Sequence, residues 1–389
     1  MQLVAYGAQD AFLTGNPEIT FFKVVYRRHT NFAMESIRQD FNGSASWGSR
    51  ATATISRNGD LITRCYIEAT LPKGTNPNNG NDVDKVSWCD SVGHKFIKEV
   101  ELEIGGQSID KHYAEWLEIW SELTLPAEKA SGYERMVGKS DYRDETTTPS
   151  SGDTIFVPLQ FFFCRNPGLA LPLIAMQYHE VKLSFNFEIA ENCIKVDLAN
   201  PEIPKDISPT LWVDYVYLDT DERRRFAQVQ HNMLIDQLQY NGGSKSNTID
   251  LSFNHPCKEL IWVKQKDDDN IKAFNFNGDS TEKQKGPISS AVLKLNGHDR
   301  FEKRDGAYFH LVQPYQHHTR SPRKFVYCYS FALSPEEHQP SGSCNFSRID
   351  NARLILEDNV GGEGINKVFA VNYNVLRIMS GMAGLAFSN

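Results

Sequence analysis

The sequence predicts an all-β fold made of two similar domains, and three observations lead to this prediction. Short apolar runs with period-two alternation recur along the chain, Gly- and Pro-rich turns separate them, and two strand patterns occur twice. Strict alternation places one face of a strand on a core and the other toward polar surroundings, as in antiparallel sheets. Many short strands punctuated by turns are typical of sandwiches and barrels.

The composition agrees with a folded protein of more than one domain. The chain has 389 residues, of which 40% are hydrophobic and 23% charged. At roughly 150 residues per domain, this length corresponds to between two and three domains. Aromatic residues reach 11%, which favours β structure because they fit a pleated, half-buried surface. The net charge of −8 argues against a dedicated nucleic-acid binder.

The strands are expected where apolar and polar residues alternate most regularly. In chain order these runs are residues 21–26, 64–71, 96–104 and 181–189. Turn residues end such runs at 72–74, 105–106, 241–243, 277–279 and 296–297. Three polar stretches are expected to be exposed loops: 72–87, 139–154 and 265–287. The most apolar stretch, Val368 to Phe387, is interrupted by polar residues and Gly, so it is interpreted as a buried strand and tail rather than a membrane span.

Helical signal is sparse. Residues 113–125 carry Trp116, Trp120 and Leu123 at spacings of three and four, which predicts a short amphipathic helix ending before Pro126. Residues 314–320, by contrast, are expected to form a loop. The N-terminus shows neither the basic nor the apolar segment of a secretory signal, so none is expected.

An internal repeat supports a duplicated domain. Residues 100–107 align with 291–298, and each copy is an alternating strand that runs into a Gly turn and then an aromatic segment. Residues 180–183 align with 351–354, again at the start of an apolar strand. The two matches together place the boundary between the copies near residues 220–226. The matched positions in the first pair are Leu102 with Leu293, Ile104 with Leu295, and Gly106 with Gly297.

No catalytic, cofactor or metal motif is found, so no cofactor is expected. The seven cysteines are odd in number and scattered without a C-x-x-C pair, which favours free, buried thiols in a reducing compartment. His310, His317 and His318 could be considered for a metal, but their spacing matches no ligand pattern and an exposed loop is favoured. Asp267–Asp269 lacks the ligand pattern of a calcium loop and is interpreted as a solvated turn.

A charged cluster near the boundary is the main candidate for a contact site. Arg223, Arg224 and Arg225 follow Asp221 and Glu222. Three arginines could bind a phosphate, but the adjacent acids favour an ion-pair network within the chain or between subunits. Two glycosylation sequons begin at Asn42 and Asn345, and they matter only if the chain meets a glycosylation machinery.

Several long strings resemble the major capsid proteins of nucleocytoplasmic large DNA viruses, the giant icosahedral double-stranded DNA viruses. They occur in the family's order almost from end to end. The strings are residues 26–33 (YRRHTNFA), 158–165 (PLQFFFCR), 170–175, 217–227 (YLDTDERRRFA), 253–262, 295–301, 339–351 and 372–382.

This resemblance implies a double jelly roll, that is, two eight-stranded antiparallel β-sandwiches side by side, with short helices in loops. The expected division is an N-terminal arm over 1–25, a first jelly roll over 26–218, and a second over 219–389 with a C-terminal tail. The implied role is structural and not enzymatic: a homotrimeric, pseudo-hexagonal capsomer that tiles an icosahedral shell.

The resemblance also implies partners and a location. These are further copies of the chain, minor capsid proteins and an internal membrane beneath the shell, with no direct contact to nucleic acid. The protein would reside in the virion and be assembled at virus factories in the host cytoplasm. It leaves open whether the chain is the principal coat protein or a paralogue. The alternative from another class is a jelly-roll enzyme or carbohydrate-binding module, since sandwich folds also host these functions.

Overall fold

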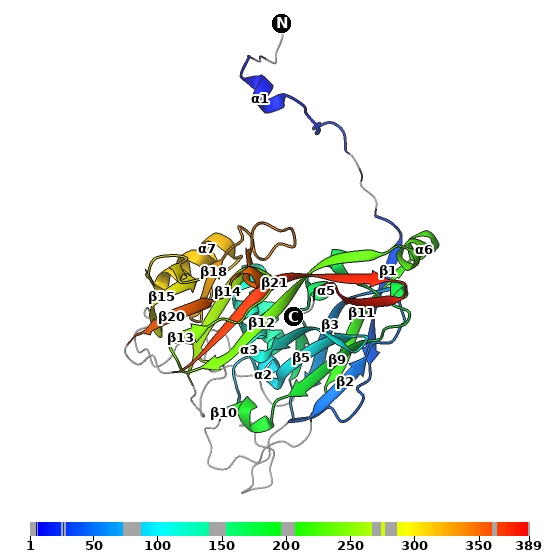
Figure 1. Cartoon of the computed structure of the whole chain (residues 1–389). Helices are drawn as coiled ribbons and strands as arrows, with labels where there is room; N and C mark the ends of the chain where they lie inside the picture. Colours follow the sequence, from blue (N-terminus) through cyan, green and yellow to red (C-terminus); the bar gives the residue numbers. More distant parts are fainter. Residues whose placement is uncertain are drawn as a thin grey trace.

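The computed structural model describes residues 5, 7–24, 26, 29–72, 87–139, 153–195, 207–266, 274–276, 286–359 and 364–387. The three loops predicted from composition, including Asp267–Asp269, lie largely outside this part of the chain. Figure 1 shows two β units side by side, with an N-terminal arm leading away from the body.

The first unit is a sandwich of two antiparallel sheets. One sheet has the order β1 (Phe32–Gln39), β11 (Thr210–Leu218), β3 (Leu61–Thr70) and β7 (Thr154–Pro158), with β8 (Leu171–Pro172) beside β3. The other has the order β2 (Arg50–Thr54), β9 (Val181–Phe187), β5 (Ile97–Ile104) and β6 (Gln107–Tyr113). A short separate ribbon joins β4 (Ser87–Trp88) to β10 (Ile194–Lys195).

The second unit repeats this arrangement. Its first sheet has the order β12 (His231–Ser244), β21 (Ile365–Met379), β14 (Pro256–Gln265) and β18 (Val326–Ser330), with β19 (Cys344–Asn345) beside β14 and β22 (Met382–Leu385) beside β21. Its second sheet has the order β13 (Thr248–Asp250), β20 (Ala352–Asp358), β15 (Ile288–Leu295) and β16 (His298–Asp299), with β17 (Arg304–Asp305) beside β15. Within the described residues, each unit thus has two sheets with a main path of four strands, which is the predicted all-β double jelly roll.

The helices are short and lie in the connections. The α-helices are α1 (Asp10–Thr14), α2 (Val92–Phe96), α3 (Ala114–Thr124), α4 (Ala127–Val137), α5 (Phe162–Arg165), α6 (Thr220–Gln228) and α7 (Gln313–His317). The 3-10 turns are η1 (Pro167–Leu169), η2 (Leu173–Ala175), η3 (Ala190–Cys193) and η5 (Phe346–Arg348), and η4 (Tyr308–Val312) is a π-helix that leads into α7. Within the described residues, no helix is long and apolar enough to cross a membrane.

The strand register confirms the internal repeat. In the first unit Leu102 of β5 lies opposite Leu183 of β9, and in the second unit Leu293 of β15 lies opposite Leu354 of β20. The two sequence matches therefore fall on the same pair of neighbouring strands in each sandwich. Alternation detected them because these leucines all point into a core.

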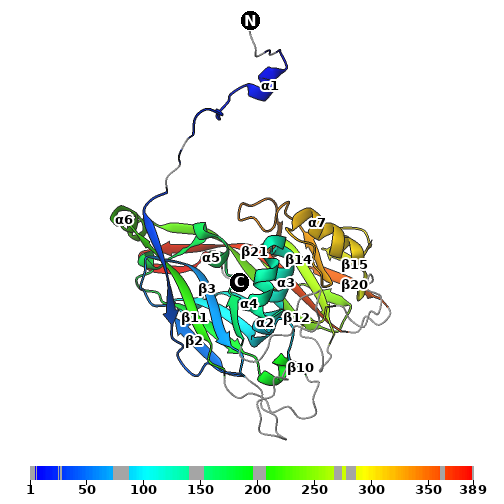
Figure 2. The same ribbon diagram turned by 180° about the vertical axis from the view of Figure 1, so that it is seen from behind.

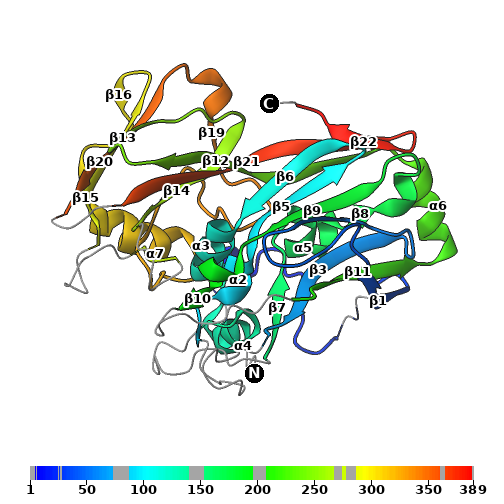
Figure 3. The same ribbon diagram turned by 90° about the horizontal axis from the view of Figure 1, so that it is seen from below.

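Two long strands, β12 and β21, serve both units. They pair along most of their length, from His231 opposite Ile378 to Ser244 opposite Asn366. One part of the pair belongs to the second sandwich, but Leu376 and Ile378 at the other end pack into the core of the first. Figure 3 shows β21 and β22 running over β6 at the top of the view. Strand β21 of the second unit thus also contributes to the first. The domain boundaries expected at 218 and 219 stay a prediction.

Most predicted elements are found, with three differences. The helix predicted over 113–125 is α3, the strands predicted at 64–71, 96–104 and 181–189 are β3, β5 and β9, and the C-terminal strand is β21. The described part of 21–26 is not a strand, because this arm has no partner strand to pair with it. The loop predicted over 314–320 is mostly helical, since Pro314 lies in the first turn of α7, where its missing N–H is tolerated. The helices α4 and α6 were not predicted.

Candidate functional site

The seam between the two sandwiches combines a buried apolar cluster with a network of buried charges. Helix α3 belongs to the connection between β6 and β7 of the first unit, yet it packs on the outer face of the second unit's sheet (Figure 2). Its buried side chains Trp116, Ile119, Trp120 and Leu123 share an apolar cluster with strands β14, β18 and β21. Their spacing follows the helical period, so one face of α3 is covered.

A buried charge network reinforces this apolar contact. The carboxylate of Glu118 on α3 is fully buried and receives three donors. Lys139 Nζ lies 2.9 Å and Lys324 Nζ 2.7 Å from Oε1, and His94 Nδ1 lies 2.8 Å from Oε2. Tyr133 OH is bonded to the other nitrogen of His94 at 2.8 Å. Lys324 comes from the segment before β18 of the second unit, so the network crosses the seam.

Further pairs connect the two units around this centre. The backbone N–H of Arg323 donates to Glu122 at 2.8 Å, and its guanidinium donates to Glu134 at 2.5 Å. Lys367 on β21 donates to Glu115 at 2.7 Å. Cations of the second unit therefore face acids of the first, which fixes how the two sandwiches meet.

The charges of this seam are stabilised by one another. Burial raises the pKa of Glu118, but Lys139 and Lys324 outweigh this effect and hold its pKa well below the usual range. Burial similarly opposes the charge of Lys324, while Glu118 and Asp90 raise its pKa. Such a network is stable only while each charge keeps its partners.

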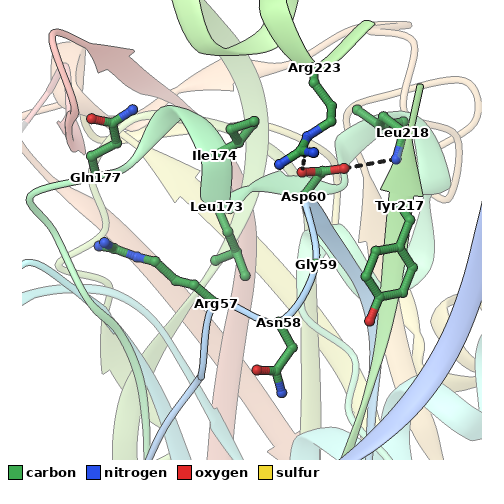
Figure 4. Close-up of a pocket in the computed structure, with 10 residues that line it drawn as sticks. All are labelled: Arg57, Asn58, Gly59, Asp60, Leu173, Ile174, Gln177, Tyr217, Leu218 and Arg223. Atoms are coloured by element: carbon green, nitrogen blue, oxygen red, sulfur yellow. Dashed lines mark hydrogen bonds and ion pairs between the residues drawn. The ribbon is translucent and has the colours of Figure 1, made fainter. Parts of the chain in front are cut away.

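The candidate residues Asp221–Arg225 are consecutive residues of one short helix. They lie on α6, which is capped by Asp219: its side chain accepts the N–H of Glu222 at 3.0 Å. Arg223 Nε donates to Asp60 at 2.9 Å, and the other oxygen of Asp60 accepts the N–H of Leu218 at 2.8 Å (Figure 4).

This pair closes one wall of a surface hollow of about 440 Å³ between α6 and the turn before β3. Figure 4 shows Arg223 reaching from α6 to Asp60. Arg224 and Arg225 are exposed, as is Asp221, and in the described part of the chain they form no ion pair. Within the described part of the chain, the expected ion-pair network thus consists of one pair, between Arg223 and Asp60, which lies far from it in the sequence. Contacts of these side chains between subunits remain a prediction.

The histidines contact protein groups rather than one another. His318 lies between two carboxylates, with Nε2 3.0 Å from Glu259 and Nδ1 2.9 Å from Glu336. His310 is bonded to the carbonyl of Val326, and His317 to that of Leu333. Among the described residues, no group of three or more His, Cys, Asp or Glu side chains could hold a metal.

The cysteines and sequons have ordinary surroundings. Cys164 and Cys344 are half-buried and the other five cysteines are buried, all as free thiols. Asn42 is exposed, and its amide donates to Thr54 at 3.3 Å. Asn345 is exposed and accepts the N–H of Ser347 at 3.0 Å. Modification of either asparagine remains a prediction.

Two family models together match nearly the whole chain. Residues 20–219 match the major capsid protein N-terminus, and residues 222–384 match the large eukaryotic DNA virus major capsid protein. The chain is 52% identical to the major capsid protein of Pyramimonas orientalis virus, over 100% of this chain and 99% of that protein. It is 42% identical to that of Paramecium bursaria Chlorella virus 1, with the same coverage.

Solved structures agree with these relatives. The chain superposes on a protein in the quasi-atomic model of the PBCV-1 virus capsid with a TM-score of 0.84 and 38% identity, covering 95% of this chain and 100% of that one. The Faustovirus major capsid protein shares the fold at a TM-score of 0.74 and 12% identity, covering 96% and 94%. The chain therefore belongs to the large eukaryotic DNA virus major capsid protein family, whose members are structural, non-enzymatic proteins of the virion shell.

Proposed function

We propose that three copies of this chain form a pseudo-hexagonal homotrimeric capsomer, and that these capsomers tile an icosahedral shell. The observation that supports this proposal is the duplicated sandwich. Both units order their strands in the same way, and α3 joins them through a buried seam. Three such chains supply six similar units, and cyclic closure is the usual way in which identical subunits assemble.

The boundaries at 218 and 219 are retained as part of this proposal. In it, α6 with Asp221–Arg225 is an exposed charged element at the boundary, available to contact a neighbouring subunit. Among the residues that the structure describes, Arg223 forms an ion pair within the chain, with Asp60, and the other four candidates form none. Arg224 and Arg225 would then form their pairs with another copy.

The exposed apolar side chains of the N-terminal arm favour contacts with partners beneath the shell. Phe12, Phe21 and Phe22 are each more than 90% exposed, and the arm leads away from the body (Figure 1). Apolar side chains at this exposure are typical of segments that bind a partner. In this proposal the partners are minor capsid proteins and the internal membrane, with assembly at virus factories in the host cytoplasm and no direct contact with nucleic acid.

The proposal is tested on the purified full chain. Native mass spectrometry and light scattering should give a trimer that persists on dilution, and electron microscopy should show hexagonal arrays. A monomer at micromolar concentration would contradict the trimeric capsomer. The variant Arg224→Glu should weaken contacts between subunits without changing the melting temperature of the separated chain, whereas an unaltered oligomer would exclude this residue from the interface.

A further inference from the structure

An aromatic stripe crosses the outer face of the first sandwich. It consists of Tyr66 on β3, Trp212 on β11 and Phe156 on β7. The ring centroid of Tyr66 lies 6.4 Å from that of Trp212 and 6.4 Å from that of Phe156. The rings of Tyr66 and Trp212 are stacked with an angle of 12° between their planes. Trp212 Nε1 donates to Glu68 at 2.6 Å, which fixes the indole. All three rings are half-exposed, and a contiguous patch of this kind marks an interaction surface.

The equivalent face of the second sandwich is covered. In the first unit Trp212 pairs with Tyr66 across β11 and β3, and in the second unit Phe369 pairs with Ile261 across β21 and β14. Phe369 and Ile261 are fully buried there under α3. The ring of Trp116 lies 5.7 Å from that of Phe369. One face is thus buried within the chain, and its counterpart is left open.

The second sandwich carries a helix in the same connection as α3. The segment formed by η4 and α7 lies between β17 and β18, as α3 lies between β6 and β7. Its side chains Leu311, Val312 and Tyr315 have the same spacing as Ile119, Trp120 and Leu123 of α3. Leu311 is 51% exposed, Val312 39% and Tyr315 82%. Tyr308 itself packs against the core of its own sandwich, so within the described residues the exposed apolar side chains of this helix are Leu311, Val312 and Tyr315.

The two open surfaces lie at opposite ends of the molecule. Figures 1 and 2 both place α7 at the outer end of the second sandwich and β11, with β1, at the outer end of the first. They cannot meet within one chain. A head-to-tail contact between two chains would bring them together, and such heterologous contacts close into rings when the rotation permits.

We propose that the η4–α7 helix of one copy packs on the Tyr66–Trp212–Phe156 stripe of a second copy, in the way that α3 packs on the second sandwich inside the chain. The inference rests on the proposed trimer and identifies its interface. In a ring of three chains the same helix-on-sheet contact then occurs six times, alternately within and between chains. The internal repeat thus identifies the partner of the stripe as the η4–α7 helix of another copy, because this helix is the counterpart of α3.

A photo-crosslinking experiment on the full chain tests the contact directly. The residue p-benzoylphenylalanine is placed at position 315, and crosslinked peptides are mapped by mass spectrometry. The expected products join two chains and attach near Tyr66, Phe156 or Trp212. The same probe at Tyr178, which is 75% exposed on the first unit, should give no product on the stripe.

Substitution gives a second, quantitative test. The double variant Leu311→Glu with Tyr315→Glu should raise the concentration at which the trimer dissociates by about 100-fold, because buried anchors of an interface carry most of its affinity. Both side chains are exposed in the single chain, so its circular dichroism and melting temperature should not change. The matched control Tyr178→Glu should leave the trimer intact.

The outcomes separate this inference from the proposed function. If the unmodified chain is monomeric, the trimeric capsomer itself is wrong. The unmodified chain can instead be a trimer while the double variant also stays trimeric, as the control does, and the crosslinks fall outside the stripe. In that case the trimer stands and this interface is wrong. Crosslinks on the stripe together with dissociation of the double variant support the inference.

Discussion

His318 is a buried cation that depends on two carboxylates. Burial lowers its pKa, but Glu259 and Glu336 outweigh burial and raise the pKa to about 12. Because the pKa in the folded state is above that in the unfolded state, the charge stabilises the fold fully below about pH 6.5. This stabilisation is lost progressively as the pH rises toward the folded value.

The variant His318→Gln tests this at the residue scale. At pH 6 it should lower the free energy of unfolding by about 3 kcal/mol, because it leaves two acids without their cation. At pH 9 the loss should be smaller, because unfolding of the wild-type chain then releases the His318 proton, and release is favoured at high pH. Urea unfolding at the two pH values measures both effects, with the exposed His298→Gln as control. Equal losses at both values would show that the charge is not responsible.

At the scale of one element, α3 holds the two sandwiches together mainly by apolar burial. Trp116 is 3% exposed and contacts both Trp120 and Phe369. Arg165 of the first unit lies over the ring of Trp120, 4.7 Å from its centroid, which adds a cation–π contact at the same place. A large side chain deleted here leaves a cavity that the two flanking sheets can only partly fill.

The variant Trp116→Ala should therefore lower the free energy of unfolding by about 3–5 kcal/mol. The measurement is chemical unfolding followed by tryptophan fluorescence and by circular dichroism. The exposed Leu333→Ala should change stability by less than about 0.5 kcal/mol. If the two variants lose the same amount, the helix does not contribute to stability through this contact.

For the whole molecule, the charge network makes the stability of the fold sensitive to acid. The pKa of Glu118 is held low in the folded state, so its contribution is complete above about pH 4.5 and is lost as the pH falls toward the folded value. Burial also raises the pKa of Glu122, but Lys139 brings it below its usual value. Protonation of either acid at low pH therefore reduces the stability of the fold.

The variant Glu118→Gln should lower the free energy of unfolding at pH 7 by about 3 kcal/mol, since Lys139 and Lys324 lose their shared partner. Between about pH 5 and pH 2 its stability should fall less steeply than that of the wild type. Melting temperatures across this range provide the measurement, and Glu302→Gln removes an exposed carboxylate as control. Parallel curves for Glu118→Gln and wild type would contradict the assignment.

Much of the fold could be predicted because alternation reports the environment of each side chain directly. The cores explain why β5, β9 and α3 were identified: their apolar positions face a sheet or helix for their whole length. The run at 21–26 has the same composition but no neighbouring strand, and composition alone cannot supply one. Helix η4–α7 was missed because Pro314 and the nearby histidines are also typical of loops.

The seam and its charges could not be predicted in the same way. A sequence shows that Glu118 and Lys324 are charged, but not that they meet across the fold in a dry environment. An ion-pair network within the chain or between subunits was expected at Arg223, but the sequence did not show that its partner within the chain is Asp60 on another segment. The partners of a charged side chain are chosen by tertiary structure, and the local sequence only supplies the candidates.

The shared strands β12 and β21 also determine the order in which the chain can fold. Leu376, Ile378 and Ala383 complete the core of the first sandwich, although they come after nearly all of the second sandwich in the sequence. During synthesis the first sandwich therefore waits with part of its apolar interior open until the C-terminal strand arrives. Such a delay exposes apolar surface to other nascent chains. A chain that lacks β21 would therefore have an incomplete core in the first sandwich as well as in the second. Such a chain is not expected to assemble into a shell.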